Sequence, residues 1–212
     1  MFDQIKTVLV LAPHPDDAEF GMGATLAKLA EEGKEVHIAV FSTCEQSTPD
    51  GFPVGSIMQE LHTSCAKLGV AAERLHTYDF SVRKFPELRQ DILESLIVLK
   101  RQVQPDLVCV PNSSDIHQDH QTIHAEGLRA FKDVCILGYE LPWNNFENAA
   151  DVFVNLEERH LAQKLDCLAS YESQRGRGYC DPDFIRSMAR VRGGQVKLQI
   201  AEAFELLRFY HR

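Results

Sequence analysis

Short apolar stretches alternate along the chain with longer segments in which apolar residues recur every three or four positions. The short stretches predict buried strands at residues 8–11, 36–41, 75–78, 107–110 and 135–139, and the alternating stretch 151–155 predicts an edge strand. The longer segments predict helices that begin near residue 20 and that cover 55–68, 87–103, 121–131, 157–171, 182–190 and 196–209.

Strands that alternate with helices are typical of a mostly parallel sheet covered on both faces. We therefore expect one α/β domain over residues 1–212, with a Rossmann-like, mostly parallel sheet, helices on both faces and a helical C-terminal part from residue 157. Ligands of such sheets bind beyond the carboxyl ends of the strands, where the strand order reverses. The loops at 12–19 and 111–120 each follow a strand, so both should open on this edge.

The composition excludes several classes of protein. Of the 212 residues, 44% are hydrophobic and 25% charged, as in ordinary globular domains. The net charge is −9 and no run of Lys and Arg forms a basic stripe, so we expect no nucleic-acid partner. No apolar run reaches about 20 residues, which argues against a membrane span. The acidic N-terminal segment leads directly into a strand, unlike a secretory signal.

The six cysteines form no C-x-x-C pair. Four of them, Cys65, Cys109, Cys135 and Cys167, lie among apolar neighbours and are expected to be reduced core residues. This use of cysteine favours the cytoplasm. A homo-oligomer is compatible with the sequence, which does not determine the oligomeric state.

The first cluster of chemically active side chains follows the strand at 8–11. It holds one imidazole and three carboxylates, those of His14, Asp16, Asp17 and Glu19. Crowded carboxylates repel one another and are costly to desolvate, and a divalent cation removes that cost. A solvated acidic loop that caps the following helix is the alternative, because Asp is common at the start of a helix.

The second cluster follows the strand at 107–110. It contains Asp115, His117, Asp119 and His120 within six positions. If a helix begins near Gln118, the two histidines lie about one turn apart and can point the same way. Two such clusters on one edge of a parallel sheet favour a shared metal ion.

Imidazole and carboxylate donors suit zinc, or another first-row divalent ion, better than calcium or magnesium. A catalytic zinc ion commonly keeps three protein ligands and a water molecule. His14, Asp17 and His120 would form such a set. A rival set uses His120 with His124, which stand four residues apart on the expected helix.

Together the motifs resemble the LmbE-like or PIG-L family of zinc-dependent N-deacetylases. The matching stretches are Pro-His-Pro-Asp-Asp-x-Glu at 13–19, Gly-x-Gly-x-Thr at 21–25 and Asp-x-His-x-Asp-His at 115–120. Less specific likenesses near the C-terminus bring the resemblance to nearly the whole chain, and they comprise Lys164 with Ser173-Gln174, Arg192-Gly193-Gly194, and Ala201 to Phe204.

The resemblance implies hydrolysis of the N-acetyl group of an amino sugar or glycoconjugate, which releases acetate and a free amine. His14, Asp17 and His120 would be the zinc ligands. Asp16 would be the general base, and a protonated His117 would stabilise the oxyanion.

Two further acids have supporting roles in this scheme. Asp119 would orient His117 or a ligand histidine. Glu19 would do the same for the first loop, or would favour the N-terminus of the following helix.

The chain departs from the family pattern in one expected substrate contact. Relatives that act on glucosamine-containing thiol precursors carry an Arg three positions before the acid that corresponds to Glu60, and Ile57 stands there in this chain. Asp79 and Arg83 are candidate substitutes for binding the substrate, although a solvated loop is the alternative. Trp143 is a candidate to stack on a sugar ring, or to anchor its loop.

Two other functions are weighed against the deacetylase. A nucleotide-binding oxidoreductase is suggested by Gly21-x-Gly23, but Leu26 stands where the third glycine of that motif belongs. A non-catalytic metal- or sugar-binding module would not need a base beside the ligands, so Asp16 discriminates it from an enzyme.

Overall fold

The computed structural model describes residues 4–147 and 149–210. Its strands form a single sheet in the order β3-β2-β1-β4-β5-β7-β6. The strands β3, β2, β1, β4 and β5 run parallel to one another. Strand β7 runs antiparallel to both of its neighbours, β5 and β6. The strands are β1 (Thr7–Ala12), β2 (Glu35–Val40), β3 (Leu75–Thr77), β4 (Leu107–Pro111), β5 (Cys135–Tyr139), β6 (Val152–Asn155) and β7 (Ala201–Arg208).

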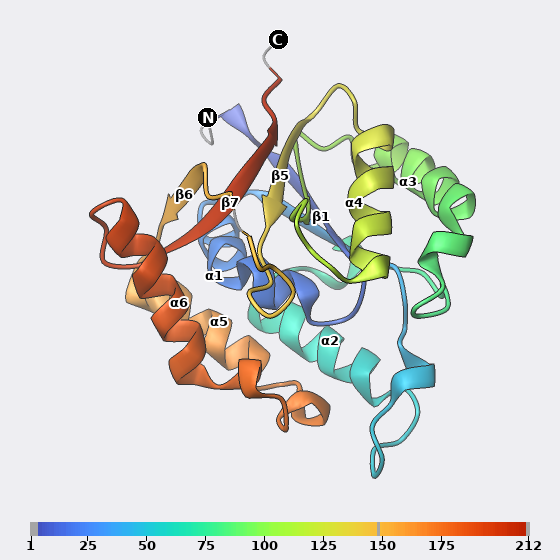
Figure 1. Ribbon diagram of the computed structural model, residues 1–212, viewed down its shortest axis with the longest axis horizontal. Coiled ribbons are helices and arrows are strands. Elements are labelled where there is room, and N and C mark those ends of the chain that lie inside the picture. The colour runs from blue at the N-terminus through green and yellow to red at the C-terminus, as the bar shows by residue number, and fades with distance from the viewer. Residues whose placement is uncertain (1–3, 148, 211–212) are drawn as a thin grey trace.

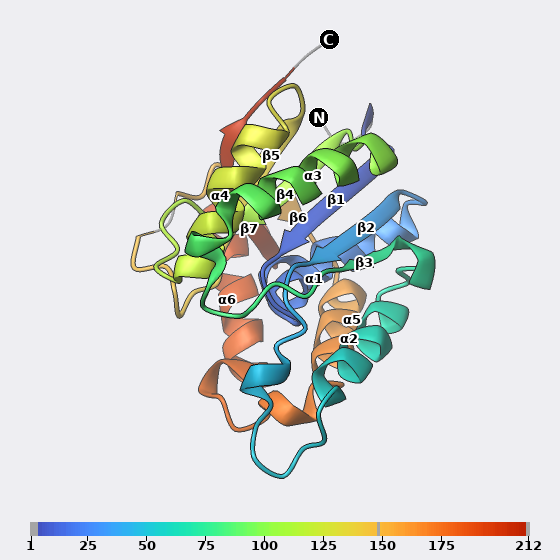
Figure 2. The same cartoon turned by 90° about the vertical axis from the view of Figure 1, so that its right-hand side faces the viewer.

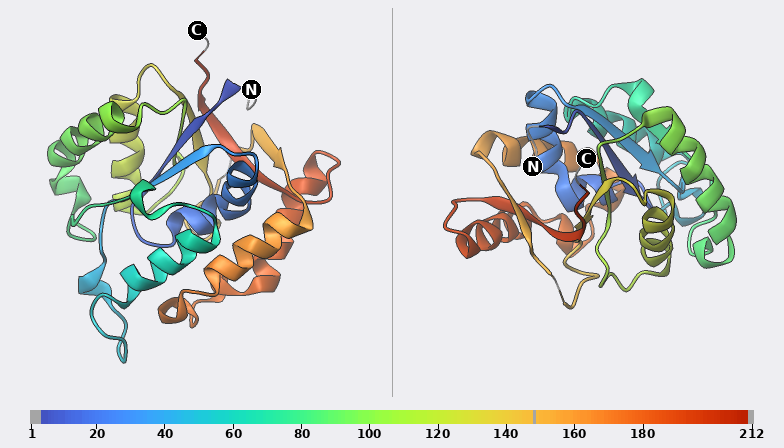
Figure 3. Two further views of the ribbon diagram at one scale, coloured as in Figure 1. Left: turned by 180° about the vertical axis from the view of Figure 1, so that it is seen from behind. Right: turned by 90° about the horizontal axis from the view of Figure 1, so that it is seen from above.

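Helices cover both faces of this sheet (Figures 1 and 3). One face carries α3 (Arg89–Val103) and α4 (Gln118–Ala130), and the other carries α1 (Asp17–Glu31), α2 (Ser56–Lys67), α5 (Glu158–Leu168) and α6 (Pro182–Gln195). Along β1, Val8 and Val10 face the larger group of helices and Leu9 and Leu11 the smaller. Burial on both faces explains why this strand is apolar at every position.

The predicted α/β fold with a mostly parallel sheet is confirmed, and the strand order places the clusters. Strands β1 and β4 are neighbours, and the chain turns outward from them to β2 on one side and to β5 on the other. Their carboxyl ends therefore form the point at which the strand order reverses. Figure 2 shows β1 and β2 running side by side toward the loops at this edge.

The prediction that the C-terminal part is helical is wrong for its last segment. Residues 196–209 do not form a helix, because Ala201–Arg208 form β7 instead. Ala, Glu and Leu are strong helix formers, so the local sequence favoured a helix. Strand β7 pairs with β5 on one side and β6 on the other, and this pairing outweighs the local preference.

The prediction that four of the cysteines are reduced core residues is confirmed for three of them. Cys65, Cys109 and Cys167 are buried, whereas Cys135 is only half-buried and Cys44 is buried instead. All six are free thiols. No helix within the described part of the chain is both long and apolar enough to cross a membrane.

Helix α1 is interrupted in its middle, and two distant side chains occupy the break. Met22 has φ −150° and ψ 25°, which are not helical values. Lys164 of α5 donates to the carbonyl of Phe20 at 2.6 Å. Glu202 of β7 accepts from the backbone N–H groups of residues 24 and 25, at 3.2 and 2.7 Å. Lys164 and Glu202 also form a buried ion pair at 2.7 Å.

The two glycines of this helix serve close packing. A Cβ atom on Gly21 would lie 2.3 Å from the ring of Tyr139, and one on Gly23 would lie 3.0 Å from the side chain of Lys164. These contacts account for Gly21-x-Gly23 without a bound phosphate, which removes the feature that suggested a nucleotide-binding oxidoreductase.

Replacing Lys164 tests whether the ion pair holds the interrupted helix. Lys164→Ala leaves the buried Glu202 carboxylate without its cation, so we expect the free energy of unfolding to fall by about 3–5 kcal/mol in urea titrations. Lys67→Ala is the control, because it removes an exposed pair with Asp166 at 3.0 Å and should cost less than about 1 kcal/mol. Similar small losses in both variants would contradict this role.

Candidate metal and active site

Three donor atoms meet beyond the carboxyl ends of β1 and β4, one from the loop after β1 and two from the first turns of α1 and α4. The Nδ1 atom of His14 lies 3.3 Å from Oδ2 of Asp17 and 3.2 Å from Nε2 of His120, and the latter two atoms are 3.3 Å apart. A tetrahedral ion with bonds of about 2.0–2.1 Å requires ligand atoms about 3.3 Å apart. The three atoms are therefore spaced as ligands of one such ion.

The charges of this cluster also fit a cation. Asp17 and His120 are only 6% and 2% exposed. Burial lowers the pKa of His14, but hydrogen bonds to Asp119 and Asp17 outweigh it and raise the pKa to about 9. The carboxylates around the site thus favour a positive charge among them, which a divalent cation between the three donors would supply.

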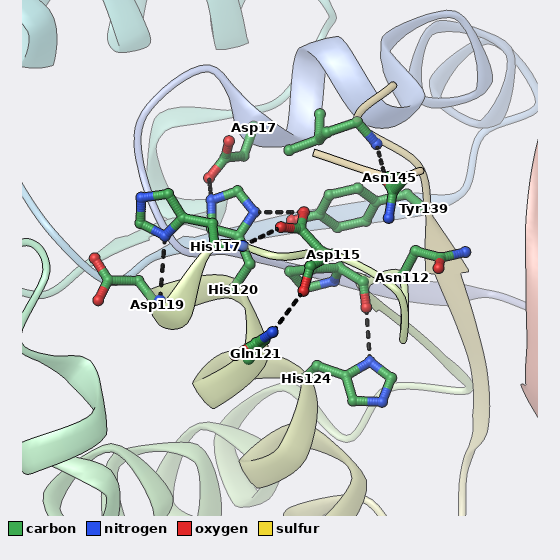
Figure 4. A network of polar contacts seen from close by, with 12 residues as sticks. Asp17, Asn112, Asp115, His117, Asp119, His120, Gln121, His124, Tyr139 and Asn145 are labelled. Carbon is green, nitrogen blue, oxygen red and sulfur yellow. Dashed lines mark hydrogen bonds and ion pairs between the residues drawn. The ribbon is translucent and has the colours of Figure 1, made fainter. Parts of the chain in front are cut away.

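Each of the two histidines is held by a carboxylate behind it. His14 Nε2 lies 3.0 Å from Asp119 Oδ2. His120 Nδ1 lies 2.8 Å from Asp115 Oδ2 (Figure 4). These contacts leave Nδ1 of His14 and Nε2 of His120 facing each other. Such carboxylate–histidine pairs are typical of metal sites, where they fix the orientation of the ligand ring.

Asp115 is a supporting residue to which our sequence analysis gave no role. Besides holding His120, it accepts a hydrogen bond from the backbone N–H of His117 at 2.8 Å. Its side chain is 2% exposed. Its position in the Asp-x-His-x-Asp-His motif was the available signal, but the spacing alone does not show which acid contacts which histidine.

Asp16 has the backbone of a strained residue. It precedes α1 with φ 86° and ψ −24°, and its side chain makes no hydrogen bond that caps the helix. A left-handed conformation costs energy in a residue other than glycine and is often found at functional sites. Burial and the charges of Asp17 and Glu19 raise the pKa of Asp16 well above its ordinary value. A capping role, the alternative from the sequence, does not account for these features.

His117 stands at the N-terminus of α4, with its ring beside the two other histidines. The ring centroids lie 5.0 Å from His14 and 4.6 Å from His120. The donor atoms of all three histidines lie within 4.8 Å of one another, so His117 also lies near any ion held there.

The protonation state expected for His117 is not the one that its surroundings favour. Burial and the neighbouring His120 and His14 lower its pKa to about 4, so the neutral ring is favoured over the protonated one. Its Nδ1 accepts from the backbone N–H of Asp119 at 3.2 Å. The proton of the neutral ring is therefore on Nε2.

Two other predicted residues lie apart from the donor triangle. The carboxylate of Glu19 accepts from the hydroxyls of Ser64 and Tyr171, both at 2.7 Å, and so ties α1 to α2 and to the segment after α5. His124 has its Nδ1 at 2.8 Å from the carbonyl oxygen of Pro111 (Figure 4). The rival pair of His120 and His124 therefore does not come together.

The three candidate substrate-binding residues have different surroundings. Asp79 is exposed and accepts from the hydroxyl of Thr43 at 3.0 Å. The guanidinium of Arg83 bonds to Ser47 at 2.9 Å, and only its backbone N–H reaches the site, at 2.6 Å from Asp119. Trp143 is half-buried, with one face stacked on another aromatic ring, so it has at most one face left for a sugar.

Residues 9–131, more than half of the chain, match the model of the PIG-L family, which is described as GlcNAc-PI de-N-acetylase. The chain belongs to the PIG-L family. This confirms the resemblance drawn from the motifs.

Two PIG-L relatives in sequence are deacetylases by name. The uncharacterized deacetylase YaiS of Escherichia coli (strain K12) is 29% identical over 173 residues, which cover 79% of this chain and 91% of YaiS. The diacetylchitobiose deacetylase of Thermococcus kodakarensis is 28% identical over 161 residues, which cover 74% of this chain and 57% of that enzyme. This chain thus spans little more than half the length of the second relative.

Solved structures share the fold of this PIG-L chain. The N,N'-diacetylchitobiose deacetylase of Pyrococcus horikoshii superposes with a TM-score of 0.78 at 22% identity, over 97% of this chain and 85% of that one. The 4-carboxy-2-hydroxymuconate hydratase of Pseudomonas putida gives a TM-score of 0.80 at 18% identity, over 98% of both chains. The same fold therefore supports more than one reaction, and function must be argued from the site.

Matched histidine variants test the metal site. His14→Ala and His120→Ala each remove a donor, so we expect zinc affinity, measured by titration calorimetry, to fall by far more than ten-fold. Asp115→Asn loosens His120 and should cost about 10–100-fold. His124→Ala is the control and should bind zinc as the wild type does. Equal losses in the His120 and His124 variants would support the rival pair instead.

Proposed function

We propose that this chain is a zinc-dependent N-deacetylase that hydrolyses the N-acetyl group of an amino sugar or a glycoconjugate and releases acetate. The proposal rests chiefly on the triangle of donor atoms in His14, Asp17 and His120, with sides of 3.2–3.3 Å. Asp16 is close enough to Asp17 and His14 for their charges to shift its pKa. Two imidazoles and one carboxylate that can bind a metal, with a further carboxyl group close by in Asp16, suit hydrolysis by a metal-activated water molecule.

The proposed mechanism assigns one task to each side chain. His14, Asp17 and His120 would hold a divalent cation, which would supply a water molecule of lowered pKa and polarise the amide carbonyl. Asp16 accepts the proton of the attacking water and returns it to the departing amine. His117 donates from Nε2 to the carbonyl oxygen as negative charge develops there. A neutral imidazole can do this, because a directed N–H donor acts without carrying a full charge.

Asp115 and Asp119 keep the histidines oriented during these steps. Asp119 is fully buried and also accepts from the backbone N–H groups of Arg83 and Phe85, at 2.6 and 3.3 Å. It thereby joins the loop after β3 to the ligand loops. Because these carboxylates already hold the histidine rings in place, the rings need to move less during the reaction.

A sugar substrate is supported by the family and by the named relatives. The family description refers to GlcNAc-PI, and the Thermococcus relative is named for diacetylchitobiose. Six free cysteines favour a reducing compartment, so we propose the cytoplasm as its location.

The variant Asp16→Asn separates an enzyme from a metal-binding module. The amide cannot take a proton from water, so we expect acetate release from N,N'-diacetylchitobiose to fall by about 10²–10⁴-fold while zinc binding persists. Mass spectrometry of the sugar and calorimetry with zinc measure the two effects. Asp91→Asn, on the exposed surface of α3, is the control and should leave both unchanged.

Two results would contradict the assignment. Full activity in Asp16→Asn would show that another group is the base. If the zinc-loaded wild type releases acetate from none of a panel of N-acetylated sugars, nucleotide-linked sugars and N-acetylglucosaminyl conjugates, the deacetylase proposal fails.

A further inference from the structure

Arg177 is a cation at the edge of the proposed active site to which no role has been given so far. It lies in the segment between α5 and α6, far in sequence from both ligand loops. Its guanidinium donates to the hydroxyl of Tyr179 and lies 5.8 Å from the centre of that ring. The side chain therefore has a defined direction although it is exposed.

Stacked aromatic rings connect Arg177 to the start of α1. Tyr179 stacks on Trp143 with ring centroids 3.9 Å apart and planes 14° apart. Both rings meet Phe20 edge-on, at 5.3 and 5.2 Å. The backbone N–H of Phe20 donates to the carbonyl of Asp16 at 2.9 Å. The stack therefore stands over the first turn of α1, beside the proposed base.

The charge of Arg177 acts on that base. Among the cationic groups near Asp16, Arg177 lowers its pKa the most, ahead of His14, although burial keeps the pKa raised overall. Arg177 is therefore close enough to Asp16 for the two charges to interact.

Two other positions, 57 and 83, were candidates for a cation that binds the substrate, and neither offers a free guanidinium near Asp16. Position 57, where the family pattern places an arginine, is an isoleucine that is only 6% exposed. The guanidinium of Arg83 is engaged by Ser47 at 2.9 Å. Arg177 differs from both positions in that its charge acts on Asp16.

We propose that Arg177 determines substrate specificity by donating hydrogen bonds to the hydroxyl oxygens of a neutral N-acetyl sugar, with the Tyr179–Trp143 stack as the wall beside the sugar ring. This inference rests on the proposed deacetylase function. A guanidinium carries five donors and no acceptor, which suits a pair of hydroxyl oxygens. The adjacent Asp16 carboxylate balances its charge, which favours a neutral acceptor over a phosphate. Aromatic rings beside it present an apolar face to the sugar.

The test compares two arginines of one segment. Arg177→Ala and Arg177→Lys are measured with N,N'-diacetylchitobiose against Arg175→Ala, whose guanidinium lies on the exposed surface 3.4 Å from Glu172. We expect KM to rise about ten-fold or more in Arg177→Ala, with kcat changed by less than about three-fold. Lysine lacks the planar fork, so Arg177→Lys should recover only part of the loss. Arg175→Ala should behave as the wild type.

A binding measurement and a charged probe complete the design. The affinity of the zinc-loaded Asp16→Asn variant for N,N'-diacetylchitobiose, a neutral sugar that this variant hydrolyses only slowly, should fall when Arg177→Ala is added, by a factor similar to the rise in KM. N-acetylglucosamine 1-phosphate should be a poorer substrate of the wild type than diacetylchitobiose. Thermal unfolding of each variant checks that the fold is intact.

Three outcomes would overturn the inference. An unchanged KM in Arg177→Ala, or an equal rise in Arg175→Ala, would show that Arg177 does not contact the sugar. A wild-type preference for the phosphate that disappears in Arg177→Ala would make the residue an anion site. If the wild type deacetylates no probe, the proposed function itself fails. This failure differs from a failure of the role of Arg177, because it appears in the wild type before any variant is measured.

Discussion

Two imidazoles and a carboxylate with donor atoms 3.2–3.3 Å apart form the constraint on which the site depends. These groups come from the segments that follow β1 and β4, and His14 and His120 stand 106 residues apart in the sequence. They meet because β1 and β4 lie side by side and parallel, so that both loops leave the same edge of the sheet. Desolvated carboxylates repel one another strongly, and such an arrangement is stable only with positive charge among them.

The C-terminal part of the chain supports this arrangement from behind. Lys164 and Glu202 satisfy the backbone groups released by the break in α1, just beyond the turn that carries Asp16 and Asp17. A second, partly buried pair joins Arg192 of α6 to Glu140, with its two contacts at 2.8 and 2.5 Å. A rigid support of this kind is what holds catalytic groups at a fixed geometry.

The same contacts explain why the C-terminal motifs accompany the two clusters. The hydroxyl of Ser173 donates to Glu60 of α2 at 2.5 Å, and Glu202 accepts from the backbone N–H groups that follow the break in α1. None of these residues belongs to the donor triangle. They fix the helices whose ends form the site, which is a role that sequence spacing does not reveal.

Much of the fold and the meeting of the two clusters could be predicted from the sequence, because both depend on local patterns. Apolar strands followed by acidic turns indicate loops on one edge of a parallel sheet, as found for the loops after β1 and β4. The strand β7 could not be predicted from its helix-forming residues, because its state depends on pairing with β5 and β6. The contact of Asp115 with His120 and the direction of Arg177 depend on loop conformations, which spacing alone does not determine.

Anomalous diffraction from crystals of the zinc-loaded chain is the measurement that tests the central claim most directly. The account predicts one zinc ion within about 2.0–2.2 Å of His14 Nδ1, Asp17 Oδ2 and His120 Nε2. An ion bound elsewhere, or one held by His117 in place of Asp17, would contradict it.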